Sequence, residues 1–300
     1  MRSPHVERHV IESGGELVYY ACGTGPVILF VNGLGASWHA FRSQIAHLSD
    51  RYRCLAWDYR GLFQDTPTGR GHASSIADHA GDALAILEQE NAERAAVVGW
   101  SYGVQVALQA FAQAPARIAF MVLVGGGARA PWGHTPEAGP LRQTYPAIFR
   151  LLGRVPTLVA SLAQSGVSSP EAYTWARRIG LVGAGVDAEL FAEVARNLTR
   201  LDIQRALQTL GEMERTDLSS VLGSVDVPTL VIGGDRDPFT SRAALERLVQ
   251  RIPGAEYLLL PGASHYLLLD HAQLVNLRID KVLAERGFAG QGRLASLHPR

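Results

Sequence analysis

One serine in this chain stands in a setting that favours nucleophilic chemistry. An apolar run at residues 95–98 leads directly into Gly99-Trp100-Ser101-Tyr102-Gly103, and helical spacing follows from Val104. The glycines two residues before and after Ser101 remove the Cβ atoms that would collide in a tight turn. A Gly-x-Ser-x-Gly turn between a strand and a helix exposes the serine oxygen, and the helix N-terminus favours developing negative charge. The pattern predicts that Ser101 is a catalytic nucleophile.

A serine hydroxyl attacks poorly at neutral pH until an imidazole accepts its proton. His265 follows the apolar run at residues 256–260 through a short turn, Pro261-Gly262-Ala263-Ser264. It therefore lies at the C-terminal end of a predicted strand, where the sites of open α/β sheets form. The competing histidines lack that setting, and we predict surface or core-capping roles for them: His39, His47, His72, His79, His134 and His271. His265 is the candidate general base.

Two carboxylates compete for the task of orienting that imidazole and stabilising its charged form. Asp235 and Asp237 both follow the apolar run at residues 229–232. Asp235 is nearer to the end of the strand and is better placed to brace the turn by accepting from backbone amides. Asp237 lies further along the loop, from which a side chain can reach sideways to a histidine.

The elements that must hold these residues alternate between strand-like and helical segments. Apolar runs without alternation are typical of strands buried on both faces of a parallel sheet. Alternation with helices predicts an α/β fold with a mostly parallel central sheet flanked by helices. The runs span residues 27–31, 54–57, 95–98, 118–124, 229–232 and 257–260, a hairpin around Ser13-Gly14-Gly15 precedes them, and the helical segments span residues 75–90, 104–113, 242–250 and 269–285.

One long interval breaks this alternation. Residues 128–222 contain no strand-like run, only helical spacing interrupted by prolines. An insertion of this size between two strands predicts a helical cap over one edge of the sheet; the alternative is that it continues the helical layer. We therefore expect a core at residues 1–127 and 223–285, a cap at 128–222 and a flexible tail at 286–300.

Together these segments resemble the capped α/β-hydrolase superfamily along nearly the whole chain. Val31-Asn32-Gly33-Leu34-Gly35 is similar to the family's His-Gly-x-x loop after the third strand, with Asn32 in place of His. The resemblance implies an oxyanion hole formed by the backbone N–H groups of Leu34 and Tyr102, which would stabilise a tetrahedral intermediate. Asp58-Tyr59-Arg60-Gly61 resembles the family's Asp-x-Arg-Gly segment, which we interpret as structural.

The resemblance also implies which carboxylate completes the site and where the cap insertion falls. Gly234 to Asp237 fits the family's Gly-x-x-Asp pattern, so Asp237 is expected as the acid, in the chain order Ser101, Asp237, His265 that this fold uses. The expected fold is the α/β-hydrolase fold with a helical cap inserted after strand 6. Ser264 stands where the family often has Gly.

The implied reaction is hydrolysis of a carboxylic ester or lactone through an acyl-enzyme on Ser101. A serine at this position argues against haloalkane dehalogenases and epoxide hydrolases, which attack with a carboxylate. An acyltransferase, a cofactor-free perhydrolase, a carbon–carbon hydrolase and a non-catalytic ligand receptor on the same fold remain as alternatives. The aromatic cap suggests an apolar group in a pocket between cap and sheet, and its candidate residues are Trp100, Trp132, Tyr145, Phe149, Trp175 and Tyr266.

The implied partner is a small-molecule ester or lactone, and the composition argues against two other classes of partner. The 28 acidic and 28 basic residues balance, which argues against nucleic acid or an anionic membrane surface. The two cysteines are too few for a disulfide framework. No run approaches the roughly 20 apolar residues of a membrane span, and no apolar secretory core is evident, so a cytoplasmic protein is expected. His5 and His9 lack the glutamate of a zinc-protease motif; neither a metal nor another cofactor is expected.

Overall fold

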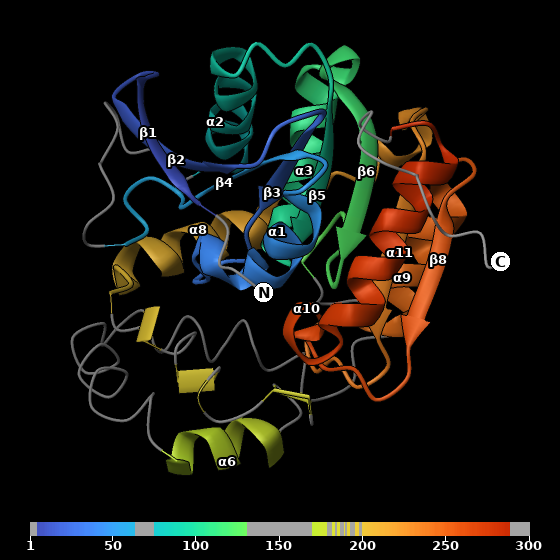
Figure 1. The fold of residues 1–300 in the computed structure, drawn as a ribbon. Helices are drawn as coiled ribbons and strands as arrows, with labels where there is room; N and C mark the ends of the chain where they lie inside the picture. The colour runs from blue at the N-terminus through green and yellow to red at the C-terminus, as the bar shows by residue number, and fades with distance from the viewer. Residues whose placement is uncertain are drawn as a thin grey trace, which may run out of the picture.

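The computed structural model describes residues 5–63, 75–130, 170–178 and 200–288, together with individual residues between 182 and 197. Figure 1 shows helices arranged around a central sheet. Three predicted pocket residues lie outside the described residues, as do two of the competing histidines and nearly all of the predicted tail: Trp132, Tyr145, Phe149, His72 and His134. The boundaries of the cap and of the tail remain predictions.

In the described part of the chain, eight strands form one sheet in the order β1-β2-β4-β3-β5-β6-β7-β8. The pairings of β1 with β2 and of β2 with β4 are antiparallel, and every later pairing is parallel. The predicted mostly parallel α/β sheet is confirmed. The strands are β1 (Glu7–Glu12), β2 (Glu16–Cys22), β3 (Val27–Val31), β4 (Arg53–Trp57), β5 (Ala95–Trp100), β6 (Ile118–Val124), β7 (Thr229–Gly234) and β8 (Glu256–Leu260).

Two apolar cores cover the opposite faces of this sheet. Along β3, Leu29 and Val31 belong to one core, whereas Ile28 and Phe30 belong to the other, as the two-residue period of a strand requires. Every residue of β3 and of β5 is buried. Burial on both faces explains why these strands are apolar throughout and show no alternation.

Most of the described helices divide between the two cores. Residues of α2, α3, α8 and α9 pack into the first core, and residues of α1, α10 and α11 pack into the second. No described helix is both long enough and apolar enough to cross a membrane. The helices are α1 (Arg42–Leu48), α2 (Ile76–Gln89), α3 (Tyr102–Gln113), α6 (Pro170–Arg178), α8 (Ile203–Arg215), α9 (Arg242–Arg251), α10 (Leu267–Asp270) and α11 (Ala272–Glu285), with 3₁₀ turns η1 (Trp38–Phe41), η2 (Pro115–Arg117) and η3 (Leu222–Ser224).

Two helical features differ from the prediction. The spacing predicts one helix over residues 269–285, whereas the structure has α10 and α11 separated at His271, with φ −124° and ψ 32°. The Asp270 carboxylate accepts hydrogen bonds from Ser264, which holds the end of α10 against the preceding turn. Helix α1 is absent from the prediction because its seven residues, of which three are buried, give too short a pattern to establish a period.

Candidate active site

Ser101 stands at the sharp turn between β5 and α3, in a backbone conformation that residues other than glycine rarely adopt. Its φ is 56° and its ψ is −116°, which costs on the order of 1–3 kcal/mol. A Cβ on Gly99 would lie 2.4 Å from the carbonyl oxygen of Gly103, and a Cβ on Gly103 would lie 2.1 Å from that of Val31. Backbone approach this close requires both glycines, as the sequence pattern predicts.

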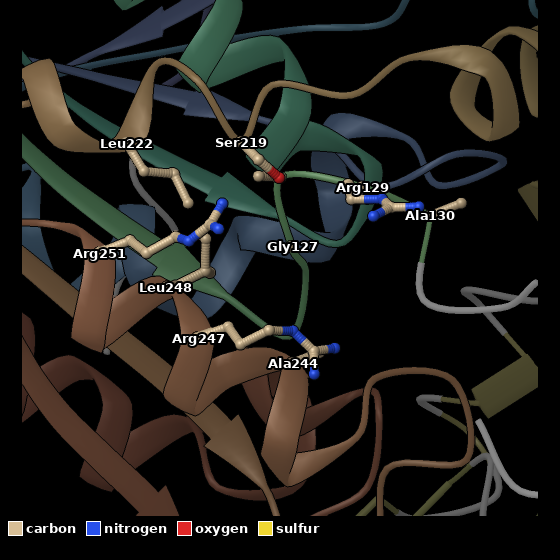
Figure 2. Close-up of a pocket in the computed structure, with 10 residues that line it drawn as sticks. Gly127, Arg129, Ala130, Ser219, Leu222, Ala244, Arg247, Leu248 and Arg251 are labelled. Carbon is tan, nitrogen blue, oxygen red and sulfur yellow. The ribbon is translucent and has the colours of Figure 1, made fainter. Parts of the chain in front are cut away.

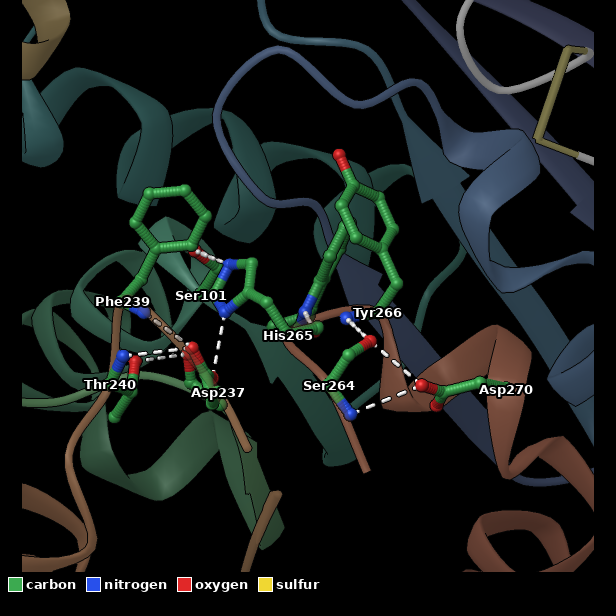
Figure 3. A network of polar contacts seen from close by, with 10 residues as sticks. Ser101, Asp237, Phe239, Thr240, Ser264, His265, Tyr266 and Asp270 are labelled. Atoms are coloured by element: carbon green, nitrogen blue, oxygen red, sulfur yellow. Dashed lines mark hydrogen bonds and ion pairs between the residues drawn. The ribbon is translucent and has the colours of Figure 1, made fainter. Parts of the chain in front are cut away.

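The structure brings His265 between Ser101 and Asp237 (Figure 3). The distance from His265 Nε2 to Ser101 Oγ is 3.0 Å, and the distance from His265 Nδ1 to Asp237 Oδ2 is 2.8 Å. A carboxylate oxygen can only accept, so Nδ1 carries the hydrogen and Nε2 is free to accept from the serine hydroxyl. This tautomer suits a base that takes a proton from Ser101.

The Asp237 side chain is fully buried and held by the loop that carries it. Its Oδ1 accepts from the backbone N–H groups of Phe239, at 2.7 Å, and Thr240, at 2.9 Å. Thr240 Oγ1 in turn donates to the carbonyl of Gly125 at the end of β6, at 2.8 Å. The remaining oxygen, Oδ2, is thereby directed at His265.

The competing carboxylate, Asp235, has a different partner. Its Oδ1 accepts from the backbone N–H of Gly262 at 2.6 Å, in the turn that precedes His265. This contact matches the backbone-bracing role considered for Asp235 from its place in the loop. Of the two carboxylates left open by the residues alone, Asp237 is the one that contacts the imidazole.

The turn around His265 depends on a carboxylate that sequence reasoning missed. Asp270 Oδ2 accepts from Ser264 N–H at 3.1 Å and from Ser264 Oγ at 2.7 Å, and Tyr266 N–H donates to Ser264 Oγ at 3.1 Å (Figure 3). The Asp270 side chain is fully buried. On the other side, Trp100 Nε1 donates to the backbone carbonyl of His265 at 3.1 Å. The one available signal in the sequence was the carboxylate five residues after the histidine.

The predicted oxyanion loop runs directly beside the nucleophile. A Cβ on Gly33 would lie 3.3 Å from the Cβ of Ser101, so Leu34 follows at the edge of the site. Asn32, which stands where the family usually has His, donates from Nδ2 to the carbonyl of Trp57 at 2.6 Å. The loop is therefore braced by Asn32, while the donor roles of the Leu34 and Tyr102 amides remain predictions.

The segment after β4 is bonded to two neighbouring elements, the 3₁₀ turn η1 and helix α2. Asp58 Oδ1 accepts from the backbone N–H of Trp38 at 2.7 Å. Arg60 forms a buried ion pair with Asp82 of α2, with its Nε 3.0 Å from Asp82 Oδ2. Burial raises the pKa of Asp82 to about 6, against the opposing effect of Arg60. These contacts fit the structural interpretation of the Asp-x-Arg-Gly segment.

The described pocket candidates lie in different surroundings. Trp100 is buried, and its ring lies 5.6 Å from the His265 ring and 5.2 Å from that of Tyr266, which is partly buried. Trp175 on α6 is 65% exposed and makes no ring contact with His265 in the described structure. Trp100 and Tyr266 therefore adjoin the triad, whereas Trp175 is largely exposed to solvent.

Part of the predicted cap packs against the helix that follows His265. Leu269 of α10 forms a small apolar cluster with Ala176 of α6 and with Val182 and Val186. A Cβ on Gly183 would lie 2.0 Å from Asp270 Oδ2. The segment around Gly183 thus approaches the Asp270 carboxylate with no room for a side chain, and it reaches the same edge of the sheet as the triad.

A separate cavity of about 140 Å³ opens between the segment after β6 and helix α9 (Figure 2). None of the triad residues lines it. Arg129, which lines the cavity, forms an ion pair with Asp217 at 3.5 Å. Within the described ranges, no group of three or more His, Cys, Asp or Glu side chains is arranged to hold a metal ion. The cavity is lined by Gly127, Ala128, Arg129, Ala130, Ser219, Leu222, Ala244, Arg247, Leu248 and Arg251.

Comparison with known proteins gives the family. The family described as the alpha/beta hydrolase fold matches residues 26–272 of this chain. The chain therefore belongs to the α/β-hydrolase family.

The relatives carry different activities. Polyketide synthase ThaQ of Burkholderia thailandensis is 30% identical over 84% of this chain, which spans only 11% of that protein. The pimeloyl-[acyl-carrier protein] methyl ester esterase of Neisseria meningitidis is 26% identical over 82% of this chain and 73% of its own length. The solved structure of bromoperoxidase from Bacillus anthracis has a TM-score of 0.75 at 20% identity, covering 93% of this chain and all of the other. The last likeness concerns the fold alone.

Proposed function

We propose that this hydrolase cleaves a carboxylic ester or lactone with an apolar group, through an acyl-enzyme on Ser101. The observation that carries the proposal is the continuous hydrogen-bonded series from Ser101 Oγ through His265 to Asp237, at 3.0 and 2.8 Å. The relation to a methyl ester esterase supports the choice of an ester substrate. The apolar preference rests on Tyr266 beside the triad and on the aromatic residues of the predicted cap.

In the first half of the reaction, Ser101 Oγ attacks the carbonyl carbon while His265 Nε2 takes the hydroxyl proton. The carbonyl oxygen becomes an oxyanion, which the backbone N–H groups of Leu34 and Tyr102 stabilise by a few kcal/mol each. The intermediate collapses when the ester carbon–oxygen bond breaks. His265 delivers its proton to the departing alcohol oxygen, and the acyl group stays on Ser101.

In the second half, a water molecule takes the place of the alcohol. His265 Nε2 accepts one proton from the water as its oxygen attacks the acyl carbon, and then returns that proton to Ser101 Oγ when the bond to the acyl group breaks. The products are a carboxylic acid and the free enzyme. Asp237 keeps its position throughout and stabilises the imidazolium that forms in each half.

The direct kinetic test uses Ser101→Ala with a short-chain p-nitrophenyl ester. The parent is expected to release nitrophenol and the variant to lose about three or more orders of magnitude in kcat, with an unchanged melting temperature. Activity of the variant within tenfold of the parent contradicts the proposal.

The relation to part of a polyketide synthase favours a second candidate, transfer of the acyl group from Ser101 to an alcohol or thiol. The triad performs the same steps, with the acceptor O–H or S–H giving its proton to His265 in place of water. Product analysis with added alcohols and thiols separates the two. Acylated acceptor in excess of free acid at millimolar acceptor would favour transfer, and free acid alone would favour hydrolysis.

A further inference from the structure

Three ring side chains lie buried beneath the predicted oxyanion hole and contact one another. Tyr59 stacks on His79 of α2 with ring centroids 4.4 Å apart, and its ring meets that of Tyr102 edge to face at 5.4 Å. Each of the three residues is at most 1% exposed. They come from three separate elements: the loop after β4, helix α2 and the first turn of α3. None of them takes a place in the proton transfers described above.

One hydrogen bond from these ring residues fixes the loop that carries the Leu34 amide, which is the loop arm of the predicted oxyanion hole. Tyr59 O–H donates to the backbone carbonyl of Asn32 at 2.6 Å, two residues before Leu34. The Asn32 side chain is bonded in turn to the Trp57 carbonyl. The peptide that leads into Gly33 and Leu34 is thus fixed from both its backbone and its side chain.

A second hydrogen bond fixes the first turn of α3, which carries the Tyr102 amide and is the helix arm of the predicted oxyanion hole. Tyr102 Oη lies 2.9 Å from His79 Nδ1. Burial lowers the pKa of His79 to about 4 and raises that of Tyr102 well above its usual value. Near neutral pH both groups are therefore uncharged, and a single hydrogen bond joins the phenol oxygen of Tyr102 to the imidazole nitrogen of His79. The side chain of the residue whose amide is expected to bind the oxyanion is anchored at its far end.

The two arms also touch each other directly. A Cβ on Gly103 would lie 2.1 Å from the carbonyl oxygen of Val31 and 2.8 Å from that of Asn32. The first turn of α3 and the loop therefore pack backbone to backbone without intervening side chains. If one arm moved toward the other, the two backbones would collide, so the position of each arm depends on that of the other.

We propose that Tyr59 and His79 are positioning residues for the oxyanion hole, each fixing one of its two amide-bearing segments. The inference rests on the proposed function of Ser101 and on the predicted roles of Leu34 and Tyr102. Oxyanion donors act only at about 2.7–3.1 Å from the developing charge, and a misplacement of about 1 Å near the chemistry can cost about a hundredfold in rate. The hydroxyl of Tyr59 and the imidazole of His79 supply that accuracy without touching the substrate.

The experiment compares Tyr59→Phe and Tyr102→Phe with the parent. Each change keeps the ring and removes one hydroxyl, so that one arm is released at a time. We expect kcat for a p-nitrophenyl ester to fall by about 10- to 100-fold, with KM within about twofold of the parent. Because phenylboronic acid forms a tetrahedral adduct with a serine nucleophile, its dissociation constant should rise by a similar factor.

Tyr19→Phe is the matched control. Tyr19 is a buried tyrosine of β2 whose hydroxyl donates to Glu90 at 2.7 Å, away from the triad. Its loss should lower the melting temperature while kcat and phenylboronic acid affinity stay within twofold of the parent. The control thus separates a purely structural hydroxyl from a positioning one.

The proposal is overturned if both test variants behave like Tyr19→Phe, with a lower melting temperature and unchanged kcat and boronate affinity. If Tyr59→Phe does not fold, Tyr102→Phe is read by the same criteria. His79→Asn, whose amide lies where Nδ1 of the imidazole lay and can still bond the Tyr102 hydroxyl, should then retain more activity than Tyr102→Phe. Failure of the proposed function has a different signature. In that case the parent and Ser101→Ala bind phenylboronic acid equally and neither releases nitrophenol.

Discussion

The nucleophile and the base are held in place by different means. Ser101 is fixed by backbone geometry, since its positive φ and the contact of Gly103 with the Val31 carbonyl leave no other path for the chain. His265 is fixed by side chains, because Asp237 bonds its ring and Asp270 bonds the neighbouring Ser264. Geometry that the backbone determines can be recognised in the local sequence from its glycines. Geometry that side chains determine depends on residues that are brought together only by folding.

The largest effect is expected at the nucleophile turn. Gly103→Ala places a Cβ against the backbone carbonyl of Val31, and we expect the free energy of unfolding to fall by about 3 kcal/mol with loss of esterase activity. Gly81→Ala in α2 is the control, because no atom lies within 4 Å of the added Cβ. That variant should gain about 0.5–1 kcal/mol. Urea unfolding of both variants measures the difference, and equal stabilities would break the contrast.

The base side of the comparison is tested with two carboxylates two residues apart. Asp237→Asn turns an acceptor toward Nδ1 into an amide that favours the wrong imidazole tautomer, so kcat should fall by up to about ten-thousandfold. Asp235→Asn weakens the bond from the Gly262 N–H and should lower the melting temperature with a small change in kcat. A catalytically dead Asp235→Asn beside an active Asp237→Asn would reverse the assignment.

Burial of His79, near the nucleophile, makes the free energy of unfolding depend on pH. Its pKa of about 4 in the folded protein lies below the usual 6.5, so the unfolded chain binds more protons than the folded one between these values. Stability from this residue is present above pH 6.5 and is lost as the pH falls toward 4, by about 2 kcal/mol between pH 7 and pH 5. Urea unfolding of the parent and of His79→Gln at both pH values checks this. An equal loss of stability in the two proteins would contradict it.

A smaller effect is expected from the carboxylate that braces the base turn. Asp270→Asn weakens the acceptor for Ser264 while keeping the side-chain volume, and we expect kcat to fall by about tenfold as His265 loses its fixed position. Asp78→Asn is the control, since Asp78 belongs to the capping box of α2, where its carboxylate accepts from Ser75. Steady-state kinetics of both variants decide, and equal kcat values would show that Asp270 is structural only.

The smallest effects concern the predicted cap. Single changes of its aromatic residues to Ala should alter the ratio of kcat/KM between short and long acyl esters by about fourfold, which corresponds to the roughly 0.8 kcal/mol of one buried methylene. Trp175→Ala should change it least, because Trp175 is 65% exposed. An unchanged ratio in all four variants would argue against a cap that lines the pocket; the residues are Trp132, Tyr145, Phe149 and Trp175.

The same division explains what could be predicted from the sequence. The buried parallel strands and the turn at Ser101 follow from apolar runs and paired glycines, which are local signals. His265 could be chosen because it follows a strand, and Asp237 needed the family pattern to be preferred over Asp235. In each case the residue type and its position relative to a strand carried the prediction.

Other parts of the site carry no such local signal. His79 was assigned only a surface or core-capping role, yet its imidazole bonds Tyr102 beside the nucleophile. Its position in α2 reveals that it is buried, but helical periodicity does not identify the partner. Asp270 was missed for the same reason, since its bonds to Ser264 require the end of α10 to turn back on the preceding loop.

The most direct test of the central claim is to locate the acyl group. The parent and Ser101→Ala are mixed with a p-nitrophenyl ester, quenched with acid within milliseconds to seconds, and analysed by intact mass and peptide mapping. The account predicts a mass increase of one acyl group on the peptide that contains Ser101 in the parent, and none in the variant. An acyl group on any other residue, or equal labelling of both proteins, would contradict it.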